Sequence, residues 1–68
     1  MIDGNEIKEL REAANLTQRE LAFAAGVSAE FISYVEANKK DASVSVLARI
    51  AGKLGVTVND LLVKSEVV

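Results

Sequence analysis

The stretch LAFAAGVSAEFIS, residues 21–33, places a single glycine between two short apolar runs at helical spacing. Leu21, Ala22 and Ala25 come before Gly26 in this stretch. Two helices that meet at a steep angle over a three- or four-residue turn need a small residue where they approach and a residue that tolerates positive φ at the corner. Ala22 meets the first need and Gly26 the second. The stretch therefore predicts two short helices joined by a tight corner.

Residues that favour helix starts stand before both predicted helices. Thr17 and Glu20 have the spacing of a capping box, which predicts the start of the helix that Gly26 ends. Ser28 is a good N-cap for the next helix, whose inward positions are Ile32 and Val35. Val27 joins the inward set at the corner.

The same reasoning predicts three further helices. The first begins at Asp3 and ends near Asn15, a residue suited to the left-handed exit position. The fourth lies between the N-cap Ser43 and Gly55, and a last short helix begins at Thr57. The residues expected to face inward in these helices are Ile7, Leu10, Ala14, Leu47, Ile50, Ala51, Leu54, Leu61 and Leu62. We expect one all-α domain over residues 1–68, with five short helices, no strand and a frayed tail at 64–68.

The amino-acid composition excludes several kinds of binding and catalytic site. The chain has 68 residues, of which half are apolar and only three are aromatic, so many small aliphatic contacts between helices are expected. It contains no cysteine and no histidine, which excludes disulfides, thiolate zinc sites and imidazole metal ligands. No metal or cofactor is expected, and no nucleophile–base pair suggests an enzyme.

No apolar run approaches the roughly 20 residues that a membrane span needs, and the amino end lacks the features of a signal peptide. We expect a cytoplasmic protein.

The net charge of −2 by itself predicts neither nucleic-acid nor membrane binding. Residues 16–43 carry three basic and four acidic side chains, a net of −1; they are Arg19, Lys39, Lys40, Glu20, Glu30, Glu36 and Asp41.

Several short pieces of the chain follow a known pattern: LR, LTQRELA, GVS, IS, VE and LARIAGKLGV. With them, residues 5–63 resemble the phage-repressor-like helix-turn-helix family of the Cro and lambda-repressor type. EFISYVEANKKDASV also resembles, more weakly, the controller proteins of restriction-modification systems. The resemblance implies a five-helix, lambda-repressor-like domain that binds double-stranded DNA through the helix-turn-helix of its second and third helices.

In this family the third helix lies in the major groove. The resemblance therefore implies that the exposed face of this helix reads bases, and its residues are Ser28, Ala29, Glu30, Phe31, Ser33 and Tyr34. Ala29 and Phe31 can contact thymine methyls, and Glu30 can accept from cytosine N4. The alternatives are a solvated Glu30 that favours the helix dipole, and partial packing of Phe31 and Tyr34 on the core.

Phosphate contacts are expected on both sides of the reading helix. They would come from Thr17, Gln18 and Arg19 at the start of the second helix, and from Asn38, Lys39, Lys40 and Ser43 after the third. Arg11 and Glu36 match a pair that joins the first and third helices in relatives. If it is buried, this pair fixes the angle of the third helix; if it is exposed, it contributes little.

A homodimer is expected because so few basic residues give a single copy weak affinity, and because the carboxyl end is rich in aliphatic residues. The expected interface is Val56, Val58, Leu62 and Val63, with Val67 and Val68 in the tail. Plain core closure is the alternative, and it suits Val56 and Leu62 better than Val58 and Val63.

The leading hypothesis is a DNA-binding transcriptional regulator that recognises an inverted repeat. The alternative is a protein-interaction module on the same fold, such as an antirepressor or an antitoxin-type partner. The low basic charge favours the alternative, whose contacts would be Phe23 and the valine-rich carboxyl end. The position of Phe23 in the motif usually faces solvent, so Phe23 either marks a protein partner or packs against a neighbouring helix.

Overall fold

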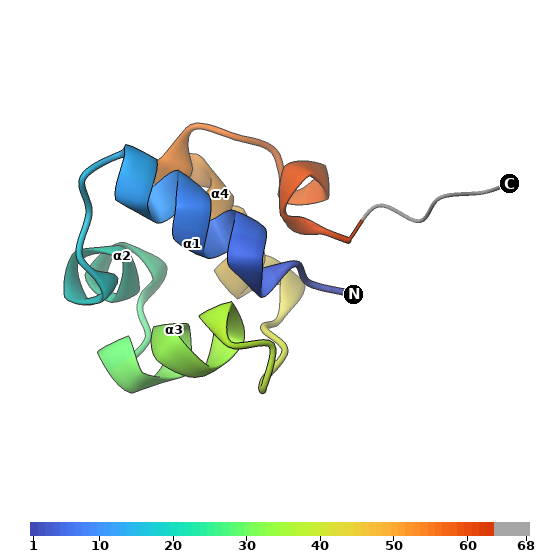
Figure 1. Ribbon diagram of the computed structural model, residues 1–68, viewed down its shortest axis with the longest axis horizontal. Coiled ribbons are helices and arrows are strands. Elements are labelled where there is room, and N and C mark those ends of the chain that lie inside the picture. The colour runs from blue at the N-terminus through green and yellow to red at the C-terminus, as the bar shows by residue number, and fades with distance from the viewer. Residues whose placement is uncertain (64–68) are drawn as a thin grey trace, which may run out of the picture.

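The computed structural model describes residues 1–63. Four α-helices and one turn of 3-10 helix follow one another in this part of the chain: α1 (Gly4–Ala13), α2 (Gln18–Ala25), α3 (Ala29–Glu36), α4 (Val44–Leu54) and η1 (Val58–Leu61). In Figure 1, α1 crosses the middle, α2 and α3 lie below it, α4 runs behind it, and η1 lies to its upper right. The predicted all-α fold class is confirmed. The predicted fraying of residues 64–68 falls outside the described residues.

Every helix begins at a side-chain cap. The hydroxyls of Thr17, Ser28, Ser43 and Thr57, and the carboxylate of Asp3, each accept a hydrogen bond from the backbone N–H three residues further on. At Thr17 the capping box is complete, because Glu20 in turn accepts from the Thr17 N–H at 2.8 Å. Each such cap stabilises its helix by about 1 kcal/mol, so the sequence determines these starts locally.

The four α-helices also end in the same way. A residue just after each helix has a positive φ, 58° at Asn15, 72° at Gly26, 60° at Asn38 and 74° at Gly55. The N–H groups at and after these positions bond back to carbonyls of the last helical turn, which is the pairing of a Schellman motif. Sequence reasoning predicted three of these exits and missed Asn38.

The core lies where the helices meet. Its largest fully buried side chains come from all five elements: Ile7, Leu21, Ile32, Val35, Ile50 and Leu61. Ala22, with 2% of its surface exposed, lies at the α2–α3 corner, where a larger side chain would push the helices apart. The Arg49 side chain of α4 supports this corner, because its Nη1 donates to the Ala25 carbonyl at 3.4 Å.

The last predicted helix differs from expectation. It is a single 3-10 turn that ends at Leu61, and Leu62 is extended. Leu62 instead forms an isolated antiparallel bridge with Ile2, which is buried. Asp3 N–H donates to the Leu61 carbonyl and Val63 N–H to the Met1 carbonyl, both at 2.8 Å. The backbone of residues 61–63 therefore forms its hydrogen bonds with residues 1–3 and does not continue into a second helical turn.

One inward prediction is wrong for a local reason. Ala14 is exposed because α1 ends at Ala13 and Ala14 already belongs to the C-cap.

In the described part of the chain, no helix has the length and apolar character needed to cross a membrane.

Candidate nucleic-acid interface

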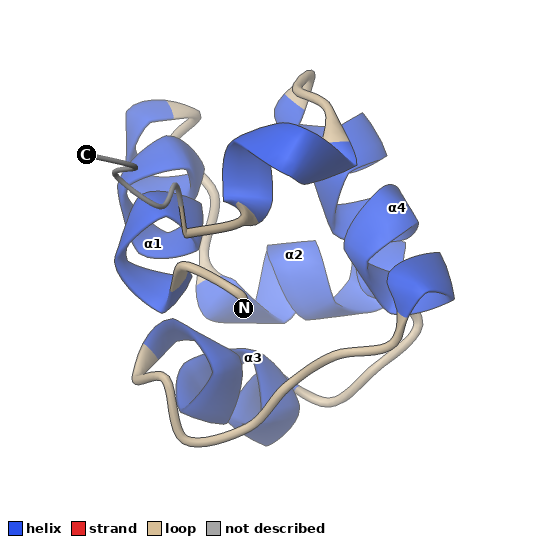
Figure 2. Cartoon of the chain, turned by 90° about the vertical axis from the view of Figure 1, so that its right-hand side faces the viewer, coloured by secondary structure: helices blue, strands red, loops and turns tan. Residues whose placement is uncertain are grey.

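Helix α3 presents a polar outer face. Ser28, Glu30, Ser33 and Tyr34 are exposed along it, while Ile32 and Val35 on the opposite side are buried. Figures 1 and 2, related by a quarter turn, both place α3 at the lower edge of the molecule. One face of the helix is thus anchored in the core and the other is open to solvent.

The predicted apolar readers lie at the edge of this face. Ala29 and Phe31 are partly buried and pack against the core. The apolar stripe of a helix is wide, so in the eight-residue α3 it includes the edge on which Ala29 and Phe31 lie. Tyr34 keeps 45% of its surface exposed. The exposed centre of the face is therefore made by Glu30, Ser33 and Tyr34.

A buried ion pair fixes α3 against α1. Arg11 Nε donates to Glu36 Oε2 at 2.7 Å, and Arg11 Nη2 donates to Glu36 Oε1 at 3.2 Å. The remaining guanidinium nitrogen, Nη1, donates to the Leu16 carbonyl at 2.7 Å. Only 10% of the Arg11 side chain and 3% of the Glu36 side chain are exposed. Glu36 therefore adds no net negative charge to the surface near α3.

Gln18 takes part in the same network. Its Nε2 donates to Glu36 Oε1 at 3.0 Å, an interaction that sequence reasoning did not foresee. One of the two amide N–H donors of Gln18 is therefore used inside the protein. The backbone N–H of Gln18 lies in the first turn of α2, where N–H groups have no partner within the helix.

The predicted hydroxyl contacts are helix caps as well. Thr17 Oγ1 accepts from Glu20 N–H at 3.0 Å, and Ser43 Oγ accepts from Val46 N–H at 3.3 Å. A capping hydroxyl still carries its own O–H donor. In the structure the Thr17 side chain also hydrogen-bonds the Glu20 carboxylate, and Ser43 Oγ lies 3.2 Å from Ser45 Oγ with either hydroxyl as the donor, so both hydroxyls have further partners within the protein.

The turn after α3 holds the lysines. Lys39 and Lys40 are exposed, and Lys40 Nζ lies 5.7 Å from the centroid of the Tyr34 ring, a cation–π distance. Asn38, the third predicted phosphate ligand of this turn, points elsewhere: its Oδ1 accepts from Gly4 N–H at 2.9 Å. The structure thus brings Lys40 beside Tyr34 and draws the Asn38 side chain towards α1.

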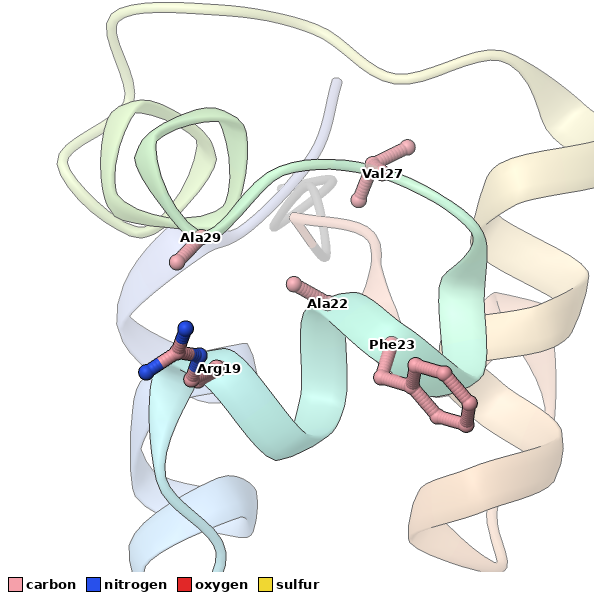
Figure 3. Close-up of a pocket in the computed structure, with 5 residues that line it drawn as sticks. All are labelled: Arg19, Ala22, Phe23, Val27 and Ala29. Atoms are coloured by element: carbon pink, nitrogen blue, oxygen red, sulfur yellow. The ribbon is translucent and has the colours of Figure 1, made fainter.

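Helix α2 carries an exposed aromatic ring. Phe23 has 91% of its surface exposed and lies between two hollows of about 460 and 370 Å³. Arg19 lines both hollows; the first continues over Ala22, Val27 and Ala29, as Figure 3 shows. The second contains the basic side chain of Lys53. The sequence singled out Phe23 but gave no reason to expect cations on both of its sides.

The structure changes the titration of Glu20. Hydrogen bonds from the backbone and side chain of Thr17 hold the pKa of Glu20 below its ordinary value of 4.5, and the charge of Lys53 acts in the same direction. Partial desolvation opposes this shift. The carboxylate is therefore committed to capping α2.

The predicted dimer residues divide into two groups. Val56, Val58 and Leu62 are partly buried and pack against the protein's own core. Val63 is 48% exposed. Core closure accounts for much of the first group, because Leu62 pairs with Ile2. The predicted contributions of Val67 and Val68 lie outside the described residues.

A family model described as helix-turn-helix matches residues 7–61. The chain belongs to this helix-turn-helix family. The match runs from the middle of α1 to the end of η1 and includes the α2–α3 corner. It agrees with the phage-repressor type of resemblance read from the sequence.

Relatives in two kinds of organism are similar over most of the chain. The immunity repressor protein of Bacillus phage phi105 is 34% identical over 97% of this chain, and the chain spans about half, 49%, of that repressor. An uncharacterised helix-turn-helix transcriptional regulator of Methanocaldococcus jannaschii is 37% identical over 91% of this chain and 94% of its own length. Both relatives are named as a repressor or a transcriptional regulator.

Solved structures of regulators have the same fold. The restriction-modification controller protein C.AhdI from Aeromonas hydrophila is 29% identical, with a TM-score of 0.81 over 87% of this chain and 89% of that one. The biofilm regulator SinR, solved in complex with DNA, is 32% identical, with a TM-score of 0.79 over 85% and 94%. A chain of the SinR–SinI protein complex is 35% identical, with a TM-score of 0.81 over 91% and 60%.

Proposed function

We propose that this chain is a sequence-specific DNA-binding regulator of transcription. A homodimer would read an inverted repeat, with α3 of each copy in the major groove. The observation that carries the proposal is the outer face of α3, where exposed polar side chains lie next to a pair of exposed lysines while the opposite face is locked into the core. The regulator names of the relatives support it.

The base-reading roles follow from chemistry and position. Glu30 can accept from cytosine N4, and Ser33 and Tyr34 can donate or accept at base edges. Ala29 and Phe31, at the edge of the face, can meet thymine methyl groups through their exposed parts. No arginine, asparagine or glutamine lies on this face, so the common bidentate interactions are missing. The shape of the DNA would then contribute much of the sequence preference.

The charges around α3 support a low affinity of one copy for DNA and a higher affinity of two copies together. Pairing with Arg11 neutralises Glu36, which removes one of the four acidic groups counted in residues 16–43. When few phosphates are neutralised the salt dependence is shallow, with a slope of about −0.9 for each of them. Two copies on half-sites about 34 Å apart would neutralise twice as many phosphates. Such work on DNA fits the cytoplasmic compartment expected from the sequence.

Selection from a random pool of duplexes tests the proposal. The chain, immobilised at low ionic strength, is expected to enrich a palindrome whose two halves are centred about one helical turn apart. Retention should fall as salt rises. A chain that retains no duplex at any salt concentration contradicts the proposal.

The protein-interaction alternative has one observation in its favour. Phe23, the aromatic side chain with 91% exposure, projects from α2 between two hollows with Arg19 and Lys53 near it. A large exposed apolar side chain with a charged rim is typical of a protein contact. The alternative predicts no salt-dependent retention of duplex, so the same selection experiment separates the two functions.

A further inference from the structure

The turn that carries Lys39 and Lys40 is built on a single unusual residue. Asn38 has φ 60°, the left-handed conformation. Asn38 N–H donates to the Val35 carbonyl at 3.0 Å, and Lys39 N–H donates to the Tyr34 carbonyl at 2.8 Å. These two bonds reverse the chain directly after α3. The backbone of Lys39 is thereby tied to the residue at the centre of the reading face.

The Asn38 side chain ties this turn to α1. Its Oδ1 accepts from Gly4 N–H at 2.9 Å, one of the N–H groups that the start of a helix leaves without a partner in the helix. Gly4 lies so close to the end of α3 that a Cβ placed on it would meet the Glu36 carbonyl oxygen at 2.6 Å. The amino end of α1 therefore forms a platform for the turn.

The turn borders a hollow. This hollow, of about 420 Å³, is lined by Asn38, Lys40 and Asp41 of the turn and by Met1, Ile2 and Val63. Lys39, Lys40 and Asp41 are all exposed. The hydrogen bond from Gly4 to Asn38 therefore bridges a place where side chains leave space.

We propose that Asn38 is a positioning residue for DNA binding. It aims the ammonium groups of Lys39 and Lys40 at phosphates and does not itself touch a phosphate. This inference rests on the proposed function, and it replaces the direct phosphate interaction that the sequence suggested for Asn38. The Oδ1 of Asn38 accepts from Gly4 N–H, so α1 orients the amide group. Its Nδ2 group carries two donors of its own, and the double-mutant comparison below tests whether these reach the DNA.

Asn38→Gly tests the inference, because glycine keeps the left-handed turn and removes only the side chain. The matched control is Asn15→Gly, which makes the same change at the exposed left-handed residue that ends α1. The probe is the duplex recovered by the natural chain from a random pool, or a random duplex at low salt. Asn38→Gly should weaken binding about tenfold and lower the salt slope by roughly 0.9 for each phosphate that the lysines no longer neutralise. Asn15→Gly should change neither.

A double-mutant comparison separates positioning from a direct interaction with DNA. In a chain that already carries Lys39→Ala and Lys40→Ala, Asn38→Gly should have almost no further effect on binding. Amide exchange at Gly4 should become faster in Asn38→Gly while the rest of α1 stays protected.

Three outcomes overturn the inference in different ways. If Asn38→Gly binds as the natural chain does, with the same salt slope, the positioning role fails and the proposed function stands. If Asn38→Gly costs as much without the lysines as with them, Asn38 touches the DNA directly. If the natural chain binds no duplex at any salt concentration, the proposed function and this inference fail together.

Discussion

Arg11 and Glu36 lie 25 positions apart in the chain and meet side on, with Arg11 Nε 2.7 Å from Glu36 Oε2 and Arg11 Nη2 3.2 Å from Glu36 Oε1. The pair joins the last turn of α1 to the last turn of α3. Leu16 and Gln18 supply the remaining hydrogen-bond partners, and Glu12 Oε2 lies 4.0 Å from Arg11 Nη2. No described buried side-chain nitrogen or oxygen is left without a hydrogen-bond partner. The angle at which α3 is presented therefore depends on this network.

Replacing Arg11 alone should be costly. Arg11→Met leaves a buried carboxylate with only Gln18 as its partner, and we expect a loss of about 3–5 kcal/mol in the free energy of unfolding. Adding Glu36→Gln removes the stranded charge and should restore part of that loss. Urea denaturation of the three chains measures both steps. A loss below about 1 kcal/mol for Arg11→Met would mean that the pair behaves like a surface ion pair.

Two glycines should respond in opposite directions to the same change. Gly4→Ala places a methyl group against the Val35 and Glu36 carbonyl oxygens, so α1 must move away from α3, and we expect a loss of about 1–3 kcal/mol. Gly52→Ala is the control, because nothing lies within 4 Å of its added Cβ in α4. It should gain about 0.5–1 kcal/mol. Thermal unfolding of both variants checks the contrast, and equal effects would contradict it.

Features that depend on neighbouring residues could be predicted from the sequence. The caps at Thr17, Ser28 and Ser43 act on N–H groups three residues away, so they could be read directly from the chain. Gly26 could be read because its role at the corner is local. The two short helices and their corner therefore followed from spacing, and the resemblance of the surrounding sequence identified them as a helix-turn-helix.

Other features depend on residues that are far apart in sequence. Ile2 is buried because it pairs with Leu62, and Gly4 is needed because α3 ends against it. Asn38 follows the same local rule as Asn15, but its bond to Gly4 spans 34 positions. No periodicity in the chain encodes such long-range pairings. The sequence therefore predicted which residues lie on the exposed face of α3 better than it predicted the hydrogen-bond partners of Gln18 and Asn38.

Protonation of Glu20 should weaken the start of α2. Because hydrogen bonds from Thr17 lower the pKa of Glu20 in the folded chain, its contribution to stability is present above the unfolded pKa and is lost as the pH falls through the folded one. Glu20→Gln keeps the cap without the charge. The stability difference between the two chains, followed from about pH 7 to about pH 3, should shrink below the ordinary value of 4.5. A difference that stays constant over this range would argue against an ionised cap.

Tyr34 and Lys40 should have separable effects on DNA. Tyr34→Ala removes a base-reading side chain, and it should relax sequence preference by about 1–3 kcal/mol at the base pair that it reads. Lys40→Ala should weaken binding to all sequences alike and reduce the salt slope by about 0.9. Tyr34→Phe keeps the ring beneath Lys40 Nζ and loses only the hydroxyl, so it should affect sequence preference without changing the salt slope. Binding to matched and mismatched duplexes measures all three, and a reading face placed elsewhere would leave Tyr34→Ala indistinguishable from the natural chain.

Two exposed valines offer a matched test of pairing. Val63, 48% exposed, follows the Ile2–Leu62 bridge at the predicted dimer face, whereas Val44, 74% exposed, lies in the first turn of α4. A glutamate at position 63 would place a charge in each half of a two-fold interface, so like charges would meet and the copies would separate. Val63→Glu should therefore shift the chain to monomer in sedimentation and weaken binding to a palindrome, while leaving binding to a single half-site unchanged. Val44→Glu should do neither, because glutamate in the first turn of a helix suits the helix dipole and no pairing is predicted there. If both variants sediment as the natural chain does, the copies pair through another surface or bind the two half-sites independently.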